Sequence, residues 1–151
     1  MDPLTPADAD YVHRVHASFS RQGIMRHIGA HITDVGPGRC EITLPYGEHV
    51  SQQHGFFHGG IVAAVADSAA GFAGFSLMPV GAGVLTVEFK INLVAPADGE
   101  LLIARGKVLR PGRTLTVSQA EVFVIKRDQE RLSAIMQQTL MTIVGRADVV
   151  G

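Results

Sequence analysis

The sequence predicts an α+β fold in which an antiparallel sheet curls around one long central helix. Residues 58–77 are small and apolar on every side, as expected for a helix surrounded by other structure. Beyond residue 83 the chain instead alternates apolar and polar residues, and turn sequences divide it into four strands with no helix between them. A doubly wound parallel sheet is therefore disfavoured, because it needs a helix between successive strands.

The part of the chain before the central helix predicts a surface helix and a hairpin. The surface helix is expected to begin with Thr5 as its N-cap and Pro6 at its first position, and to run to about Gln22. The segments GAHITDV and RCEITLP are short β-rich runs, and the Gly-Pro-Gly between them indicates a hairpin turn. A long loop then leads to the central helix.

The last four strands begin with the most regular pattern in the chain. Residues 85–93 alternate apolar side chains with Thr86, Glu88, Lys90 and Asn92, which predicts a strand with one buried face. Further strands are expected at about 100–109, 113–125 and 131–144. A curled sheet of this kind leaves its edge strands unpaired, and pairing with the edge of a second copy is one way to cover them.

Length and composition are those of a single small domain, which we expect to span residues 1–151. Thirteen basic and fourteen acidic side chains provide no general electrostatic reason to bind nucleic acid or an anionic membrane. A membrane-spanning helix is not expected, because Asp67 would lie near the middle of the apolar window 55–78. The single cysteine, Cys40, is expected to pack in a strand, and the acidic N-terminus is unlike a secretory signal, so the expected location is the cytoplasm.

Asp67 is the residue of the apolar helix that needs an explanation. A carboxylate among alanine and valine is costly to desolvate, so it should have a dedicated partner or a task to perform. One interpretation is structural, with the carboxylate held by hydroxyls such as Ser68 or by backbone donors. The other interpretation is catalytic, and it depends on the His58-Gly59-Gly60 sequence at the start of the same helix.

The start of this helix has the geometry of an oxyanion-binding site. Gly59 and Gly60 offer unpaired backbone N–H groups, with no side chain to block a ligand, at the positive end of the helix dipole. Asp67 lies about 12 Å further along the helix axis than Gly59. A carbonyl bound to the Gly59 N–H is therefore beyond the reach of the Asp67 of the same chain, and the simplest source of a carboxylate is the same helix in a second subunit. This interpretation predicts an active site that exists only in the dimer.

The spacing of these residues resembles that of the hotdog-fold acyl-CoA thioesterases, in particular the PaaI-like and 4-hydroxybenzoyl-CoA thioesterase branch. The pattern consists of Gln52, the His58-Gly59-Gly60 sequence, and then Asp67, followed by four strands. The resemblance covers residues 27–145, with residues 1–26 as an N-terminal helical segment. It implies a hotdog fold and hydrolysis of an acyl-CoA thioester to a free acid and coenzyme A, without a metal or redox cofactor.

The resemblance also implies a role for each matched residue. Asp67 is the nucleophile or the general base, and the Gly59 N–H stabilises the oxyanion. Gln52, which is Asn in some branches of the family, helps to place the water or the acyl group. Thr86 lies near the reacting carbonyl, although β-propensity alone explains a threonine there equally well. His58 is expected to orient the backbone or to hydrogen-bond near the site.

Substrate-binding residues are expected at the start of the helix and on two later segments. Gly60 is the second backbone donor. The resemblance places the phosphates and adenine of coenzyme A on Lys90 and on the Pro-Gly turn with Arg110 and Arg113, whose guanidinium groups suit phosphate oxygens. Four apolar side chains are candidates to line the acyl pocket, and they would fit the hydrophobic core equally well: Phe56, Phe57, Leu77 and Met78.

The expected assembly is a homodimer or a dimer of dimers with acyl-CoA as its small-molecule partner. Metal binding is not expected, because the pairs His27/His31 and His54/His58 have no accompanying glutamate in an HExxH arrangement. Two alternatives on the same fold are a hydroxyacyl dehydratase or hydratase and a non-catalytic acyl-CoA-binding protein. The histidine segments of the dehydratases are missing from the sequence, and the intact HGG sequence and acid argue against the non-catalytic protein. The acyl group stays open at this point: aryl and medium-chain groups both fit.

Overall fold

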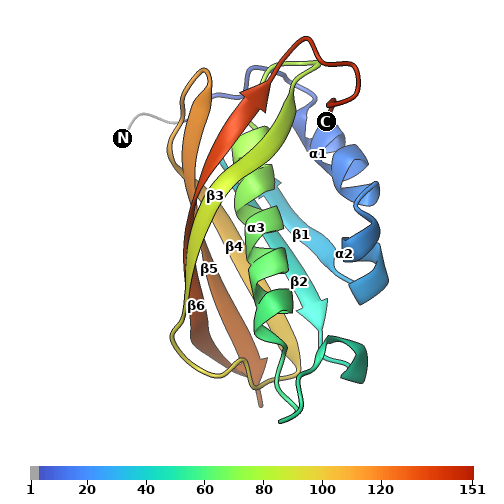
Figure 1. Ribbon diagram of the computed structural model, residues 1–151, viewed down its shortest axis with the longest axis vertical. Helices are drawn as coiled ribbons and strands as arrows, with labels where there is room; N and C mark the ends of the chain where they lie inside the picture. The colour runs from blue at the N-terminus through green and yellow to red at the C-terminus, as the bar shows by residue number, and fades with distance from the viewer. Residues whose placement is uncertain (1–3) are drawn as a thin grey trace.

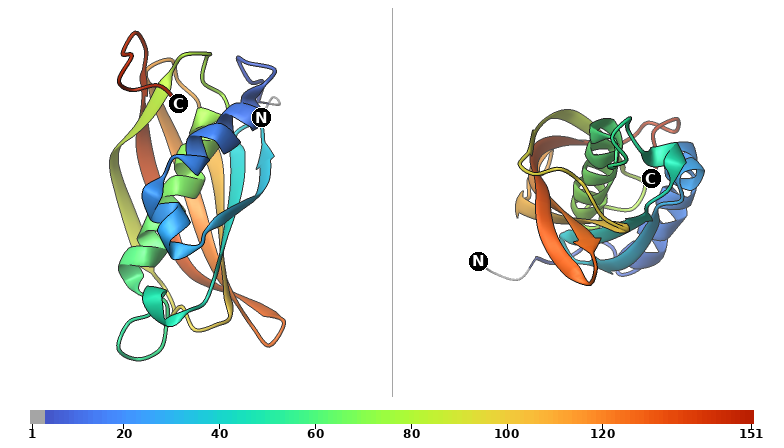
Figure 2. Two further views of the ribbon diagram at one scale, coloured as in Figure 1. Left: turned by 90° about the vertical axis from the view of Figure 1, so that its right-hand side faces the viewer. Right: turned by 90° about the horizontal axis from the view of Figure 1, so that it is seen from below.

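The computed structural model describes residues 4–151, and its centre is a single helix enclosed by a curled sheet (Figure 1). The strands are β1 to β6 in chain order, spanning His31–Gly36, Arg39–Pro45, Gly83–Leu93, Leu101–Arg110, Leu115–Lys126 and Gln129–Ile143. They form one sheet in the spatial order β1-β2-β4-β5-β6-β3, and every neighbouring pair is antiparallel. Seen from below, the sheet wraps around the helix (Figure 2). The fold class predicted from the sequence is confirmed.

The central helix, α3, spans Gly59–Phe75 and is buried along most of its length. Its small side chains let the sheet approach closely on several sides. The closest approach is at Gly106 of β4, where an added Cβ atom would lie 2.2 Å from the carbonyl oxygen of Ala69. A side chain at that position would push the helix away from the sheet, so the glycine sets the helix–sheet distance. Within residues 4–151, no helix is long and apolar enough to cross a membrane.

The N-terminal segment forms two helices where the sequence predicted one. α1 spans Tyr11–Ser20 and α2 spans Gly23–Ile28. The prediction of Thr5 as the N-cap is wrong, because Asp10 occupies that position. The Asp8 carboxylate accepts a hydrogen bond from the Asp10 N–H at 3.0 Å, and such a local turn competes with helix formation before this point.

Arg14 of α1 fastens this N-terminal segment to the end of α3. Its guanidinium group donates to the carbonyl oxygens of Met78 and Pro79, both at 2.6 Å, and lies 4.7 Å from the ring centre of Phe75. The Asp8 carboxylate completes the arrangement as an ion pair with Arg14 at 3.1 Å. α1 is thereby held alongside α3 (Figure 2, left).

β3 is an exposed edge strand, which contradicts the prediction that one of its faces is buried. In the described chain only β6 lies beside it. Leu85, Val87 and Phe89 keep 50 %, 56 % and 44 % of their surface accessible, and Leu93 keeps 55 %. The reason is position: an edge strand has no second neighbour to cover its apolar side chains. Apolar residues along an unpaired edge are typical of a strand that pairs with another chain.

A β-bulge in β3 changes which side chains face α3. The pairing with β6 shifts between Thr86 and Glu88, so Val87 is the extra residue. Thr86 faces α3 before the bulge, and Ile91 packs against the core after it. The uninterrupted alternation predicted from the sequence, with Thr86 on the polar face, is therefore wrong.

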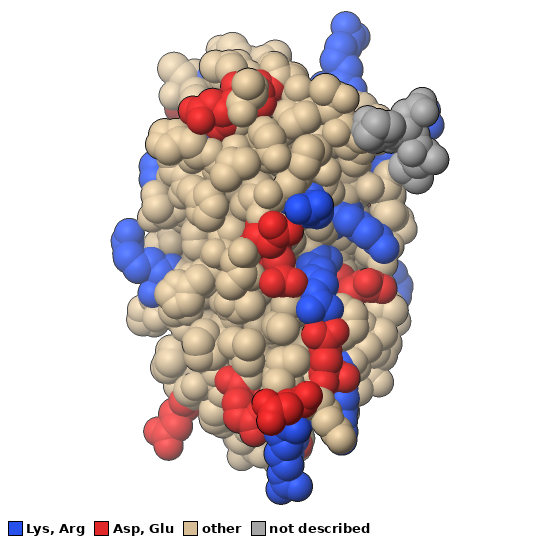
Figure 3. Space-filling model, turned by 180° about the vertical axis from the view of Figure 1, so that it is seen from behind, with Lys and Arg blue, Asp and Glu red and all other residues tan. Residues whose placement is uncertain are grey.

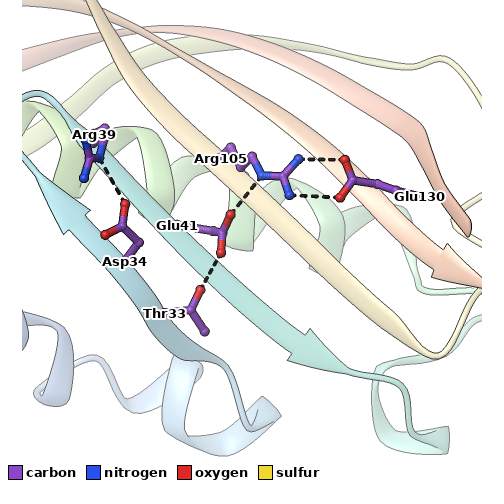
Figure 4. Close-up of polar contacts among 6 residues, drawn as sticks. All are labelled: Thr33, Asp34, Arg39, Glu41, Arg105 and Glu130. Atoms are coloured by element: carbon purple, nitrogen blue, oxygen red, sulfur yellow. Dashed lines mark hydrogen bonds and ion pairs between the residues drawn. The ribbon is translucent and has the colours of Figure 1, made fainter. Parts of the chain in front are cut away.

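The outer face of the sheet carries acidic and basic side chains next to one another (Figure 3). Arg105 of β4 donates to Glu41 of β2 at 2.8 Å and, through its two terminal nitrogens, to Glu130 of β6 at 2.7 and 2.9 Å (Figure 4). Thr33 of β1 donates to the second Glu41 oxygen at 2.8 Å. These contacts connect four strands, and the paired Arg–carboxylate geometry favours one register among them.

Cys40 is buried in β2, as expected from its place in a β-rich segment. Burial, together with the nearby Asp34 and Glu41 carboxylates, raises the pKa of the Cys40 thiol to about 12. A thiol that stays protonated at neutral pH is a poor nucleophile, so Cys40 acts as a core side chain.

Candidate active site

Asp67 lies in the middle of α3, half-buried, with its carboxylate turned toward β3. The Thr86 hydroxyl donates to Asp67 Oδ1 at 2.7 Å. Burial raises the pKa of Asp67, and the hydrogen bond from Thr86 lowers it in part. A carboxylate with a raised pKa is a better proton acceptor near neutral pH than an ordinary aspartate, which suits a general base.

A buried glutamine holds the helix turn that carries Asp67. Gln138 of β6 is fully buried, and its side-chain amide donates to the Asp67 backbone carbonyl at 3.3 Å. Sequence reasoning did not find Gln138. The sequence does contain a signal for this residue. Gln138 lies between Met136 and Leu140, two residues away from each on the same face of β6, and both of these are core residues.

A small cavity of about 70 Å³ opens beside the Asp67 carboxylate. Gln22, which precedes α2, reaches this cavity, and its side-chain oxygen accepts a hydrogen bond from the Ser68 hydroxyl at 3.1 Å. No local pattern marks Gln22 as a site residue, because the contact joins segments 46 residues apart. The lining is completed by Gly71, Phe72, Val84 and Thr86.

The start of α3 presents one free backbone donor. His58 is the N-cap, and its Nδ1 accepts the hydrogen bond from the Gly60 N–H at 2.9 Å. The N–H groups of Ile61 and Val62 both bond to the His58 carbonyl oxygen, at 2.9 and 3.0 Å. Within residues 4–151, no acceptor occupies the Gly59 N–H. Gly60 is therefore engaged with His58, and Gly59 is the donor left for a ligand.

Gln52 and Gly59 line the same cavity, which measures about 470 Å³ and is largely apolar. Phe56 and Phe57, two of the four candidates for the acyl pocket, lie in this cavity as well. The loop is closed by a hydrogen bond from the Gln52 N–H to the Phe56 carbonyl at 2.9 Å, and the Gln52 side-chain oxygen accepts from the His54 N–H. The structure thus joins the predicted glutamine, glycine and aromatic residues in one place.

The remaining sequence candidates lie elsewhere. Leu77 and Met78 line a different cavity of about 670 Å³ at the other end of α3, together with Arg113 of the β4–β5 turn. Arg110 is exposed at the end of β4. Lys90 is exposed on β3, where its ammonium group donates to the Asn92 side chain at 2.7 Å. Within one chain, none of these basic side chains reaches the cavity with Gly59.

The two halves of the site are also separated within one chain. Asp67 and Gly59 lie on the same helix, about 12 Å apart along its axis. They line different cavities, one at the middle of α3 and one at its start. A half-buried carboxylate and a free backbone donor, carried by a helix inside a curled antiparallel sheet, are the features of a hotdog-fold hydrolase.

Comparison with known proteins identifies the family. The family model described as the thioesterase superfamily matches residues 54–130, so the chain belongs to that superfamily and is a thioester hydrolase. A putative esterase from Halobacterium salinarum is 32% identical over 125 residues, which cover 79% of this chain and 82% of the relative.

Two solved structures place the fold within the family. A thioesterase family protein from Silicibacter pomeroyi is 49% identical and superposes with a TM-score of 0.88, covering 89% of this chain and 99% of the other. The PaaI protein from the phenylacetic acid degradation operon of E. coli is 20% identical, with a TM-score of 0.80 over 92% of this chain and 97% of the other, and it shares the fold. The resemblance to the hotdog-fold thioesterases predicted from the sequence is confirmed at the level of the superfamily.

Proposed function

We propose that the protein hydrolyses an acyl-CoA thioester to a free acid and coenzyme A, at a site shared by two subunits. The observation that carries this proposal is the separation of Asp67 from the free Gly59 N–H on one helix, about 12 Å along the axis. A thioester carbonyl within hydrogen-bond distance of Gly59 requires a carboxylate from a second chain. The exposed apolar edge of β3 is the surface on which that chain would pair.

The geometry of β3 specifies how the two chains would pair. Gly59 lies against Leu93, whose Cδ1 is 3.0 Å from the position of a Cβ added at Gly59, and Asp67 is bonded to Thr86. The partner's Asp67 reaches Gly59 if the partner's Thr86 lies beside Leu93. Antiparallel pairing of the two β3 strands brings the partner's Thr86 beside Leu93 when the two-fold axis passes midway between positions 86 and 93.

The chemistry follows from these groups. The carbonyl oxygen of the thioester accepts from the Gly59 N–H, which stabilises the negative charge that develops on it. In the nucleophilic form, an oxygen of the partner's Asp67 bonds to the carbonyl carbon, the C–S bond breaks, and water then hydrolyses the anhydride. In the general-base form, the partner's Asp67 takes a proton from water while the water oxygen bonds to the carbonyl carbon. The proton then passes to the departing sulfur.

The remaining candidates have supporting roles in this proposal. The cavity with Gln52 and the two phenylalanines is large and apolar enough for an aryl or medium-chain acyl group. In the register that brings the partner's Asp67 to Gly59, the end of the partner's α3 lies about 12 Å beyond the start of this chain's α3, just outside the Gly59 cavity. Arg110 and Arg113, which sit at the end of α3 in one chain, would then approach the other chain's Gly59 cavity and meet the coenzyme A phosphates.

The test is to incubate the purified protein with a panel of acyl-CoA substrates and to measure the release of free thiol over many turnovers. Asp67→Asn should lower kcat at least about a hundredfold, because the attacking or proton-accepting oxygen is lost. Asp34→Asn is the matched control, since it removes an exposed aspartate of β1 paired with Arg39. Near-parent turnover in a folded Asp67→Asn protein would contradict the proposal and return Asp67 to a structural role.

A further inference from the structure

The cavity beside Asp67 has the size and the lining of a water site. Its volume of about 70 Å³ is large enough for about two water molecules, each of which takes about 30 Å³ in the liquid. Four of its seven lining residues, Gln22, Asp67, Ser68 and Thr86, carry polar side chains. A water molecule in a protein needs two to four polar partners, and these side chains supply them.

The Gln22 side chain has a defined orientation toward this cavity. Its Oε1 accepts the Ser68 hydroxyl at 3.1 Å, so the acceptor end of the amide is occupied and the NH₂ end is available as a donor. An NH₂ group and a carboxylate that line one small cavity present a water molecule with a donor and an acceptor. Such a water accepts from Gln22, donates to Asp67, and keeps a lone pair free for attack.

The backbone around Gln22 is fixed against α3. Its N–H donates to the Phe19 carbonyl at 2.9 Å, and its own carbonyl accepts from the Arg26 N–H at 3.3 Å. The Phe19 ring packs edge-on against Phe72 of α3, with 5.7 Å between the ring centres. Gln22 therefore stands on a segment that is anchored to the same helix that carries Asp67.

From these contacts we propose that Gln22, oriented by Ser68, positions the hydrolytic water next to Asp67. This inference rests on the proposed function and adds a residue from the N-terminal segment, outside residues 54–130 that match the family model. The water oxygen bonds to the acyl carbon while its proton goes to the Asp67 carboxylate, and the Gln22 NH₂ group holds the water in line. The C–S bond then breaks, and the departing coenzyme A thiolate takes the proton from Asp67. Gln22 and Asp67 of one chain act together on a substrate bound to the Gly59 of the other.

The test is a double-mutant cycle between Gln22 and Ser68, with steady-state kinetics on the best acyl-CoA of the panel. Gln22→Leu replaces the amide with an apolar side chain that is one atom shorter and makes no hydrogen bonds, and it should lower kcat about ten- to a hundredfold. KM and the affinity for free coenzyme A should stay at the parent values, because the ground-state contacts of the substrate are unchanged. Ser68→Ala should lower kcat less.

The double variant should be no slower than Gln22→Leu alone, since both residues act through one water. The matched control is Gln129→Leu, which changes an exposed glutamine at the start of β6 and should behave like the parent. A parent-like kcat for Gln22→Leu, a rise in KM alone, or strictly additive losses in the double variant would each overturn the inference. Loss of activity in Asp67→Asn with no effect of Gln22→Leu would reject this inference only. Retained activity in Asp67→Asn would reject the proposed function itself.

Discussion

Two opposing effects act on the Asp67 carboxylate, and their balance determines the pH at which it ionises. Burial disfavours the charged form and raises its pKa, while the Thr86 hydroxyl favours the charged form and lowers it. The proposed reaction needs the ionised carboxylate, whether it attacks or accepts a proton. Activity should therefore fall as the pH is lowered through the raised pKa of Asp67, at a higher pH than for an ordinary aspartate.

Thr86→Val should move this acidic limb to still higher pH. Removing the hydroxyl takes away the one contact that lowers the Asp67 pKa, so less of the carboxylate is ionised at a given acidic pH. The measurement is the pH profile of kcat/KM for the parent and the variant, with Thr43→Val on β2 as a matched control. A limb that stays in place or moves to lower pH would show that Thr86 does not set the ionisation of Asp67.

At the scale of elements, the position of α3 depends on the sheet residues beneath it. Gly106 of β4 allows the helix backbone to approach at Ala69, and Gln138 of β6 donates to the carbonyl of Asp67. One contact sets the distance between helix and sheet, and the other fixes the turn that carries the carboxylate. The geometry of the active site is thus built into the helix–sheet packing.

Gly106→Ala should destabilise the protein by about 3 kcal/mol or more, because the added methyl group meets helix backbone that cannot rotate away. Thermal or urea unfolding measures this loss. Gly23→Ala is the control: a Cβ atom there meets nothing within 4 Å, so its stability should match or slightly exceed that of the parent. Equal stabilities of the two variants would contradict the close approach of α3 to β4.

The β4–β5 turn provides the prediction for substrate binding. Arg110→Ala and Arg113→Ala should raise KM for acyl-CoA and leave kcat largely intact, because phosphate contacts hold the ground state and the transition state alike. The effect should shrink as salt is added, since exposed charges are screened. If both variants bind coenzyme A like the parent at low ionic strength, the β4–β5 turn does not take part in substrate binding.

Most elements could be predicted from the sequence because local signals mark them. The turn residues delimit the strands, and the small apolar residues on every side mark residues 58–77 as the enclosed helix. The N-cap at Asp10 was missed, because a side-chain turn at Asp8 outweighed the N-cap and proline pattern at Thr5. The short helix α2, which follows α1 at Gly23–Ile28, was missed as well.

The candidate site was predicted only in part, for a similar reason. Asp67, Gly59 and Gln52 lie close together in the sequence, within a spacing that a known family shares. Gln22 and Gln138 reach the Asp67 turn from distant segments, so no local pattern reveals them. The bulge in β3, which turns Thr86 toward the helix, interrupts an alternation that looks continuous in the sequence.

At the scale of the whole molecule, one chain carries two half-sites. The Gly59 donor with its apolar cavity lies at the start of α3, and Asp67 with its polar cavity lies at the middle. Between them runs β3, an edge strand whose Leu85, Phe89 and Leu93 are exposed. Antiparallel pairing of two β3 strands would cover these side chains and join each donor to the carboxylate of the other chain, so the proposed dimer accounts for both observations.

The most direct test of this shared site is the activity of mixed dimers made from two differently tagged chains. One chain carries Asp67→Asn and the other carries Gly59→Pro, which removes the N–H donor. Proline suits the first position of α3, and His58 already has the extended backbone, ψ 135°, that a following proline requires. Each homodimer should be nearly inactive, and folding is checked by circular dichroism.

The mixed dimer should recover about half of the parent activity, because one of its two sites holds both intact groups. The crossed control is a dimer of one parent chain and one chain that carries both substitutions. If each active site is shared between the chains, both sites of this dimer contain one lesion and are inactive. We expect activity in the first mixture and almost none in the second. The reverse result, an inactive first mixture and a half-active second one, would place Gly59 and Asp67 in a site within a single chain and contradict the account.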